Sequence, residues 1–101
     1  MKFGLVVTDD RFHEEAVALL QAALDRRWEA RCFMTSDGVR LLVHPAFQEL
    51  AANIGAAVCE LSVERHADVA NAAHRMEDTI IIGGQYHDAE LVHHCDRVLV
   101  L

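Results

Sequence analysis

The chain has 101 residues, 52% of them hydrophobic, and a formal net charge of -7 at pH 7. This length suits a single domain, residues 1–101, that buries its own core, and the high apolar share hints at a subunit interface. The negative charge argues against nucleic-acid binding, which depends on clustered Lys and Arg side chains.

The first half of the chain predicts two strands, each followed by helical segments. Residues 2–8 form a β-branched run, and residues 11–28 carry apolar side chains at helical spacing. The run at 2–8 is too short for a membrane span and lacks the features of a secretory signal, so we expect a cytoplasmic protein without membrane contact. Residues 29–36 predict the second strand. Residues 39–55 predict two short helices, because Pro45 starts a new first turn.

The second half continues the alternation. Gly55 is placed to end the preceding helix, and Ser62 to cap the following one. We expect strands at 56–61, 79–84 and 97–101, and helices at 62–76 and 88–95. Apolar strands that alternate with helices are typical of a parallel sheet covered on both faces. The sequence therefore predicts a three-layer α/β/α fold with a mostly parallel five-stranded sheet.

In such a fold, ligands and reactive groups gather at the carboxyl ends of the strands. Asp9 and Asp10 follow the first strand, where they can cap a helix or act as ligands for a hard cation. Gly83 and Gly84 follow the fourth strand and provide flexible backbone, without the wider glycine pattern of a phosphate site. We expect all four residues at the edge of a pocket.

The three cysteines form no C-x-x-C pair, so each is interpreted separately. Cys59 ends the run AAVC, and a buried core cysteine is its simpler interpretation. Alternatively, Cys59 lies at the amino end of the next helix, which lowers the pKa of a thiol, although Glu60 beside it opposes the thiolate. Cys32 lies within a strand and Cys95 at the carboxyl end of a helix, and neither position favours a thiolate.

The seven histidines include no H-x-x-x-H pair, and His93 and His94 diverge on their helix. We therefore expect no bound transition metal. The chain also lacks a P-loop, a G-x-S-x-G motif and an H-E-x-x-H motif, and we expect no cofactor.

Three patches of the sequence, CFMTSDGVRLL (32–42), ELAANIGAAVCELSVERHAD (49–68) and CDRVLVL (95–101), resemble the DsrE/DsrF-like sulfur-relay family of DsrEFH or TusBCD type. The resemblance implies a DsrEFH-like, flavodoxin-like fold and a cytoplasmic subunit that forms homotrimers or hexamers. It also implies that Cys59 carries persulfide sulfur, in sulfur oxidation or tRNA thiolation, and that Asp37 and Gly38 shape the pocket edge. The implied partners are sulfur donor and acceptor proteins, such as a sulfurtransferase or a TusA-like protein. Glu60 and His66 depart from the residues common in the family.

Three functions fit these observations. The first is a sulfur-transfer subunit in which Cys59 accepts and donates sulfur. The second is a non-catalytic binding or assembly subunit, with Cys59 buried and the apolar helices of residues 41–54 at the interface. The third is a small metal- or ligand-binding protein that uses Asp9, Asp10, His13 or His87 at the same edge.

Overall fold

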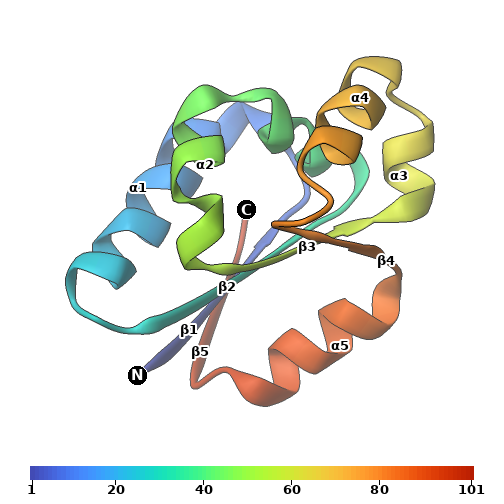
Figure 1. The fold of residues 1–101 in the computed structure, drawn as a ribbon. Helices are drawn as coiled ribbons and strands as arrows, with labels where there is room; N and C mark the ends of the chain where they lie inside the picture. Colours follow the sequence, from blue (N-terminus) through green and yellow to red (C-terminus); the bar gives the residue numbers. More distant parts are fainter.

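The computed structural model describes residues 1–101 and contains one five-stranded sheet with helices on both faces (Figure 1). All strands run parallel, in the order β4-β3-β2-β1-β5. The strands are β1 (Lys2–Val7), β2 (Glu29–Met34), β3 (Gly55–Cys59), β4 (Ile81–Gly83) and β5 (Arg97–Val100). The predicted three-layer α/β/α fold is confirmed, but the strand order differs from the 2-1-3-4-5 order of flavodoxin.

The helices divide unequally between the two faces. The 3-10 helices are η1 (Asp10–Phe12), η2 (Ser36–Val43) and η3 (Ala51–Asn53), and the α-helices are α1 (His13–Asp25), α2 (Pro45–Leu50), α3 (Glu60–Glu64), α4 (Ala67–Arg75) and α5 (Gln85–His94). Figure 1 shows α5 alone on one face of the sheet, with α1 to α4 on the other. This division follows from the topology, because the chain steps outward from β1 to β4 and then crosses back along α5 to β5.

The strands contribute side chains to two separate cores, because successive side chains of a strand point to opposite faces of the sheet. Leu5 and Val7 of β1 belong to the larger core under α1 to α4, whereas Val6 belongs to the smaller core under α5. The smaller core consists of Val6, Phe33, Ala57, Cys59 and Leu91. Cys59 therefore lies on the face that a single helix covers.

Several predicted boundaries are wrong, since the strand expected at 56–61 ends at Cys59 and the helix expected at 88–95 begins at Gln85. Gly55 does not end a helix but begins β3, where it pairs with Arg31 of β2. The helix predicted at 62–76 is interrupted after α3. The backbone N–H groups of Arg65 and His66 donate to the carbonyls of Ser62 and Val63, and these hydrogen bonds end α3. His66 then adopts an extended conformation and becomes the N-cap of α4.

Candidate functional site

Cys59 occupies the junction between β3 and α3. It is the last residue of the strand and the N-cap of the helix. Ser62, which was predicted to cap this helix, instead lies inside α3. The side chain of Cys59 packs in the smaller core beside Phe33 and Leu91, and the residue is only 6% exposed. The thiol is thus held at the carboxyl edge of the sheet but is largely shielded from solvent.

Hydroxyl groups from two elements surround this thiol. Ser62 Oγ accepts a hydrogen bond from the backbone N–H of Ser36 at 2.9 Å and lies 3.5 Å from Thr35 Oγ1. Ser36 has a φ of 52°, an uncommon value for a residue other than glycine, and its N–H reaches across from the end of β2. With this N–H bound to the oxygen, the hydrogen of the Ser62 hydroxyl is free to point toward Cys59.

The pKa of the Cys59 thiol lies below its ordinary value as the result of opposing effects. Burial raises it, but hydrogen bonds from the hydroxyl and backbone N–H of Ser62, the hydroxyl of Thr35 and the backbone N–H of Leu61 lower it by more. The carboxylate of Glu60, expected to oppose the thiolate, is exposed to solvent, which screens its charge.

The other two thiols behave differently. Burial raises the pKa of Cys32 to about 12. Burial also raises the pKa of Cys95, with smaller effects from the charges around it. Among the three cysteines, only Cys59 has a lowered pKa, and the thiolate is the nucleophilic form of a cysteine.

The turn at Asp37 and Gly38 connects the ends of β1 and β2 with the start of α4. Gly38 lies against the backbone of β1, where a Cβ atom would be 2.0 Å from the carbonyl oxygen of Val7. Asp37 is exposed, and its Oδ1 lies 3.5 Å from Nε2 of His66. Arg40 Nη2 lies 3.3 Å from the other ring nitrogen of His66. The turn therefore contacts His66, which directly follows α3, the helix that contains Ser62.

Gly83 and Gly84 lie at the end of β4, the strand that borders β3 on the side opposite to β2. Gly83 is the register partner of Cys59 in the β3–β4 pair, and Gly84 is the N-cap of α5. A Cβ atom on Gly83 would lie 2.4 Å from Cδ2 of His87, whereas one on Gly84 would meet nothing within 4 Å. Only Gly83 is therefore required by close packing.

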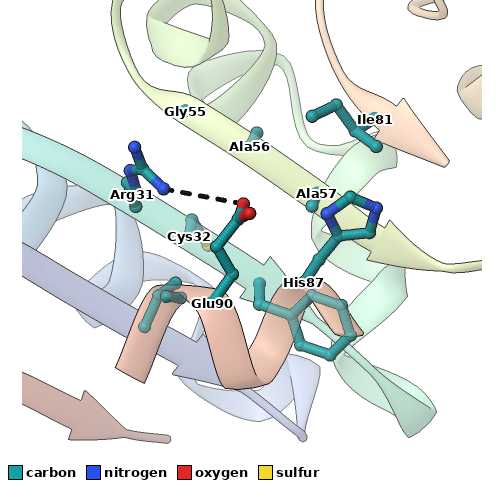
Figure 2. A pocket seen from close by; sticks show the side chains of 10 residues that line it. Arg31, Cys32, Gly55, Ala56, Ala57, Ile81, His87 and Glu90 are labelled. Atoms are coloured by element: carbon teal, nitrogen blue, oxygen red, sulfur yellow. Dashed lines mark ion pairs between the residues drawn. The ribbon is translucent and has the colours of Figure 1, made fainter. Parts of the chain in front are cut away.

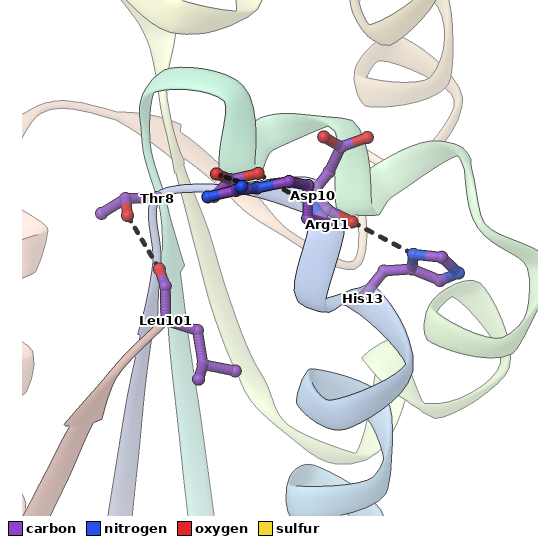
Figure 3. A network of polar contacts seen from close by, with 6 residues as sticks. Thr8, Asp10, Arg11, His13 and Leu101 are labelled. Atoms are coloured by element: carbon purple, nitrogen blue, oxygen red, sulfur yellow. Dashed lines mark hydrogen bonds and ion pairs between the residues drawn. The ribbon is translucent and has the colours of Figure 1, made fainter.

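Asp9 and Asp10 lie apart from this site, at the end of β1; Figure 3 shows Asp10 with Arg11 and His13. Asp9 caps η1 by accepting the backbone N–H of Arg11 at 3.0 Å, and it pairs with the Arg11 side chain at 2.8 Å. The backbone hydrogen bond is the main cause of the lowered pKa of Asp9. The carbonyl of Asp10 accepts a hydrogen bond from Nδ1 of His13 at 3.1 Å. Asp9 is therefore a helix cap, whereas Asp10 contributes its backbone carbonyl to the contact with His13.

A recess of about 240 Å³ opens between α5 and the strands β2 to β4 (Figure 2). Its floor is apolar, and the ion pair of Arg31 and Glu90, 3.8 Å between Nη1 and Oε1, crosses one side. His87 lines the recess near the end of β4. The recess shares three lining residues, Phe33, Ala57 and Leu91, with the core that contains Cys59, although Cys59 itself does not line it.

No three His, Cys, Asp or Glu side chains are arranged to hold a metal ion. The four residues of the metal hypothesis are divided between two places, since Asp9, Asp10 and His13 lie at the end of β1 and His87 lies over β4. None of the helices has both the length and the apolar character needed to cross a membrane.

Sequence reasoning did not find the role of the Ser62 hydroxyl, and it considered His87 only as a metal- or ligand-binding residue at this edge. Ser62 was expected only as a helix cap, but its spacing from Cys59 reads C-x-x-S. This is the spacing of the C-x-x-C motif, in which the amino-terminal cysteine has a lowered pKa. His87 carries no such signal, because its place beside Cys59 depends on the pairing of β3 with β4.

Comparison with known proteins gives no match, whether to a protein-family model, to a curated protein or to a solved structure.

Proposed function

We propose that the protein is a small DsrE-like sulfur-relay subunit, which carries persulfide sulfur on Cys59 between a donor and an acceptor protein. The observation that carries this proposal is the set of hydrogen-bond donors around Cys59, which lowers its pKa despite burial. Thiol and persulfide exchange proceeds by attack of a thiolate, so a carrier needs one stabilised thiolate. Burial of Cys32 and Cys95 raises their pKa values and leaves Cys59 as the candidate carrier.

The chemistry of the relay uses the same thiolate twice. The Cys59 thiolate attacks the outer sulfur of a donor persulfide, the donor S–S bond breaks, and the donor leaves as a thiolate. A thiolate of the acceptor then attacks the outer sulfur on Cys59 and releases Cys59 again. Thr35 and Ser62 stabilise the anionic sulfur before the first step and after the second.

The proposal extends to the setting of this chemistry. A sulfurtransferase or TusA-like protein in the cytoplasm supplies or receives the sulfur, and the subunit acts as a homotrimer or hexamer. The support for these points is the sequence resemblance, together with apolar side chains that the monomer leaves exposed. The largest exposures on the edge strand β5 are those of Leu99 and Val100.

The burial of Cys59 favours a second candidate function, a non-catalytic binding or assembly subunit with the same fold. In that case Cys59 is a core residue, and its 6% exposure reflects packing alone. The apolar side chains of residues 41–54 contribute little to such an interface, however, because Leu41, Leu42, Phe47 and Leu50 are buried within the domain. An assembly subunit would have to use other surfaces, such as β5.

Sulfur loading separates the two candidates. After incubation with a persulfide donor, mass spectrometry should find one added sulfur atom on Cys59 of the wild-type protein. Cys59→Ser should gain none while it stays folded, and Cys95→Ser should load normally. If Cys59 resists alkylation in the native protein and Cys59→Ser is strongly destabilised, the assembly function replaces the sulfur-relay function.

A further inference from the structure

We propose that His87 forms a catalytic pair with Cys59 and moves the proton in the sulfur-transfer step. The inference rests on the proposed function of Cys59 and assigns to the pair the sulfane sulfur of a cysteine persulfide as its substrate. His87 lies in the first turn of α5, on the one helix that covers the Cys59 side of the sheet.

The pairing of β3 with β4 places the two side chains together. Cys59 and Gly83 are register partners, and neighbouring strands lie about 4.8 Å apart with partner side chains on the same face. Gly83 has no side chain, and the ring of His87 fills the vacated space. A Cβ atom on Gly83 would be 2.4 Å from Cδ2 and 2.5 Å from Nε2 of His87. The Nε2 edge of the imidazole therefore lies at the Gly83 position, one strand away from Cys59 and on the same face of the sheet.

The surrounding residues support this placement. Ala57 and Ile81, the register pair two residues before Cys59 and Gly83, line the same recess as His87. Figure 2 shows the ring of His87 projecting from α5 over β3 beside Ala57. The ring of Tyr86 packs edge-on against that of His87, with centroids 5.4 Å apart. The recess provides space for a reacting group next to the imidazole.

The pair can complete the transfer without an oxidant or a reductant. Neutral His87 takes the proton of the Cys59 thiol, and the resulting thiolate attacks the outer sulfur of a persulfide R–S–SH. A bond forms from Cys59 to that sulfur, the S–S bond of the donor breaks, and R–S⁻ leaves. The protonated imidazole then gives its proton to R–S⁻, so the products are Cys59–S–SH, R–SH and neutral His87.

The glycines next to His87 provide a matched test. Gly83→Ala should push the imidazole away from Cys59 while keeping it in the protein, because the new Cβ would overlap the ring. Gly84→Ala should have no such effect, since nothing lies within 4 Å of its Cβ position. His87→Gln removes the proton carrier, and His93→Gln is its control on the exposed side of the same helix.

The measurement is the rate of sulfur loading on Cys59 from glutathione persulfide, followed by mass spectrometry from pH 5.5 to 9. Gly83→Ala and His87→Gln should load roughly 10²-fold more slowly at pH 7, the lower end of the usual contribution of a general acid or base. Both should lose the inflection that the imidazole gives to the pH profile. Gly84→Ala and His93→Gln should match the wild type.

Failure of this proposal is distinguishable from failure of the proposed function. If the wild type loads sulfur and Gly83→Ala and His87→Gln load equally fast with the same pH profile, the pair is rejected and the sulfur-relay function stands. If the wild type loads no sulfur, the relay function is rejected. The pair is then judged by alkylation of Cys59 with iodoacetamide, where an unchanged pH profile in His87→Gln rejects it and a lost inflection supports it.

Discussion

Ser62 Oγ accepts the backbone N–H of Ser36 at 2.9 Å, which links the first turn of α3 to the end of β2. This contact occupies a lone pair of the hydroxyl oxygen and leaves the hydroxyl hydrogen for Cys59. The buried Ser62 hydroxyl therefore both holds α3 against Ser36 and stabilises the thiolate of Cys59. Removal of the hydroxyl should therefore change reactivity and stability together.

Ser62→Ala should raise the pKa of Cys59 and slow its alkylation at pH 7 by roughly tenfold, since a hydrogen bond to a charged group contributes about 1.5–3 kcal/mol. The variant should also lose about 1–3 kcal/mol of stability, because the N–H of Ser36 loses its partner. Iodoacetamide kinetics and urea denaturation measure the two effects.

Thr8→Val is the matched control for Ser62→Ala. It removes a hydroxyl that donates to the carbonyl of Leu101 at 2.8 Å, after the end of β1, which β2 separates from β3 (Figure 3). Alkylation of Cys59 should proceed at the wild-type rate in this variant. An unchanged rate in Ser62→Ala would show that the serine does not stabilise the thiolate.

The strands were predictable from sequence because β-branched and small apolar runs of this length suit a buried parallel sheet. The break after α3 was not predictable from sequence, since no Gly or Pro lies at this position. It arises where His66 meets Asp37 and Arg40, contacts that join residues far apart in the chain. A prediction from local pattern cannot include such contacts.

The candidate site shows the same division. The position of Cys59 at a strand end followed from the order of elements, and so did its nearness to the Asp37 turn. The approach of His87 did not, because it needs the β3–β4 register and a missing side chain at Gly83. Asp9 and Asp10 were placed at the carboxyl edge correctly, but β2 separates their strand from that of Cys59.

Gly38→Ala should be strongly destabilising. Its Cβ would lie 2.0 Å from the carbonyl oxygen of Val7 and 2.9 Å from the backbone nitrogen of Thr8, so backbone must move. No glycine has a positive φ, and the cost therefore comes from contact alone. We expect a loss of about 3 kcal/mol or more, equivalent to a fall in Tm of roughly 12 °C or more. Thermal unfolding followed by circular dichroism measures this change.

Gly84→Ala is the control for Gly38→Ala, because open space surrounds its Cβ position. Its Tm should fall by only a few degrees, because Ala is less favourable than Gly at the N-cap position that Gly84 occupies. A Tm for Gly38→Ala within 2–3 °C of the wild type, which is below 1 kcal/mol for a domain of this size, would mean that the turn at Asp37 can move away from β1.

Acid should destabilise the protein through the stacked pair of His13 and His44, whose ring centroids are 3.9 Å apart at an interplanar angle of 4°. Burial lowers the pKa of His44, the charge of His13 lowers it further, and Asp10 opposes both. The unfolded chain therefore binds this proton more readily than the folded protein. Stability from neutral His44 is present above about pH 6.5 and is lost as the pH falls below that value.

Urea denaturation at pH 7.5, 6.5 and 5.5 should show this loss, and His44→Gln should reduce it. His93→Gln should keep the wild-type dependence, because His93 is exposed. The hydrogen bond with His94 is the main cause of the lowered pKa of Glu29. The stability that Glu29 contributes is therefore lost only below its ordinary pKa of 4.5, outside the pH range of this experiment. The same pH dependence in His44→Gln and in the wild type would assign the effect to other groups.

The edge strand β5 should mediate self-association. Leu99 is 46% exposed and Val100 is 66% exposed, and Arg97 is the one charged residue of this edge strand. Light scattering at micromolar concentration should give the mass of a trimer or hexamer for the wild type. Val100→Lys should lower that mass, because it places a charge at the edge. Leu61→Lys, at a position that is 67% exposed beside Cys59, is the control and should leave the mass unchanged. A monomeric wild type would exclude assembly, and a lower mass for Leu61→Lys alone would move the interface to the Cys59 edge of the sheet.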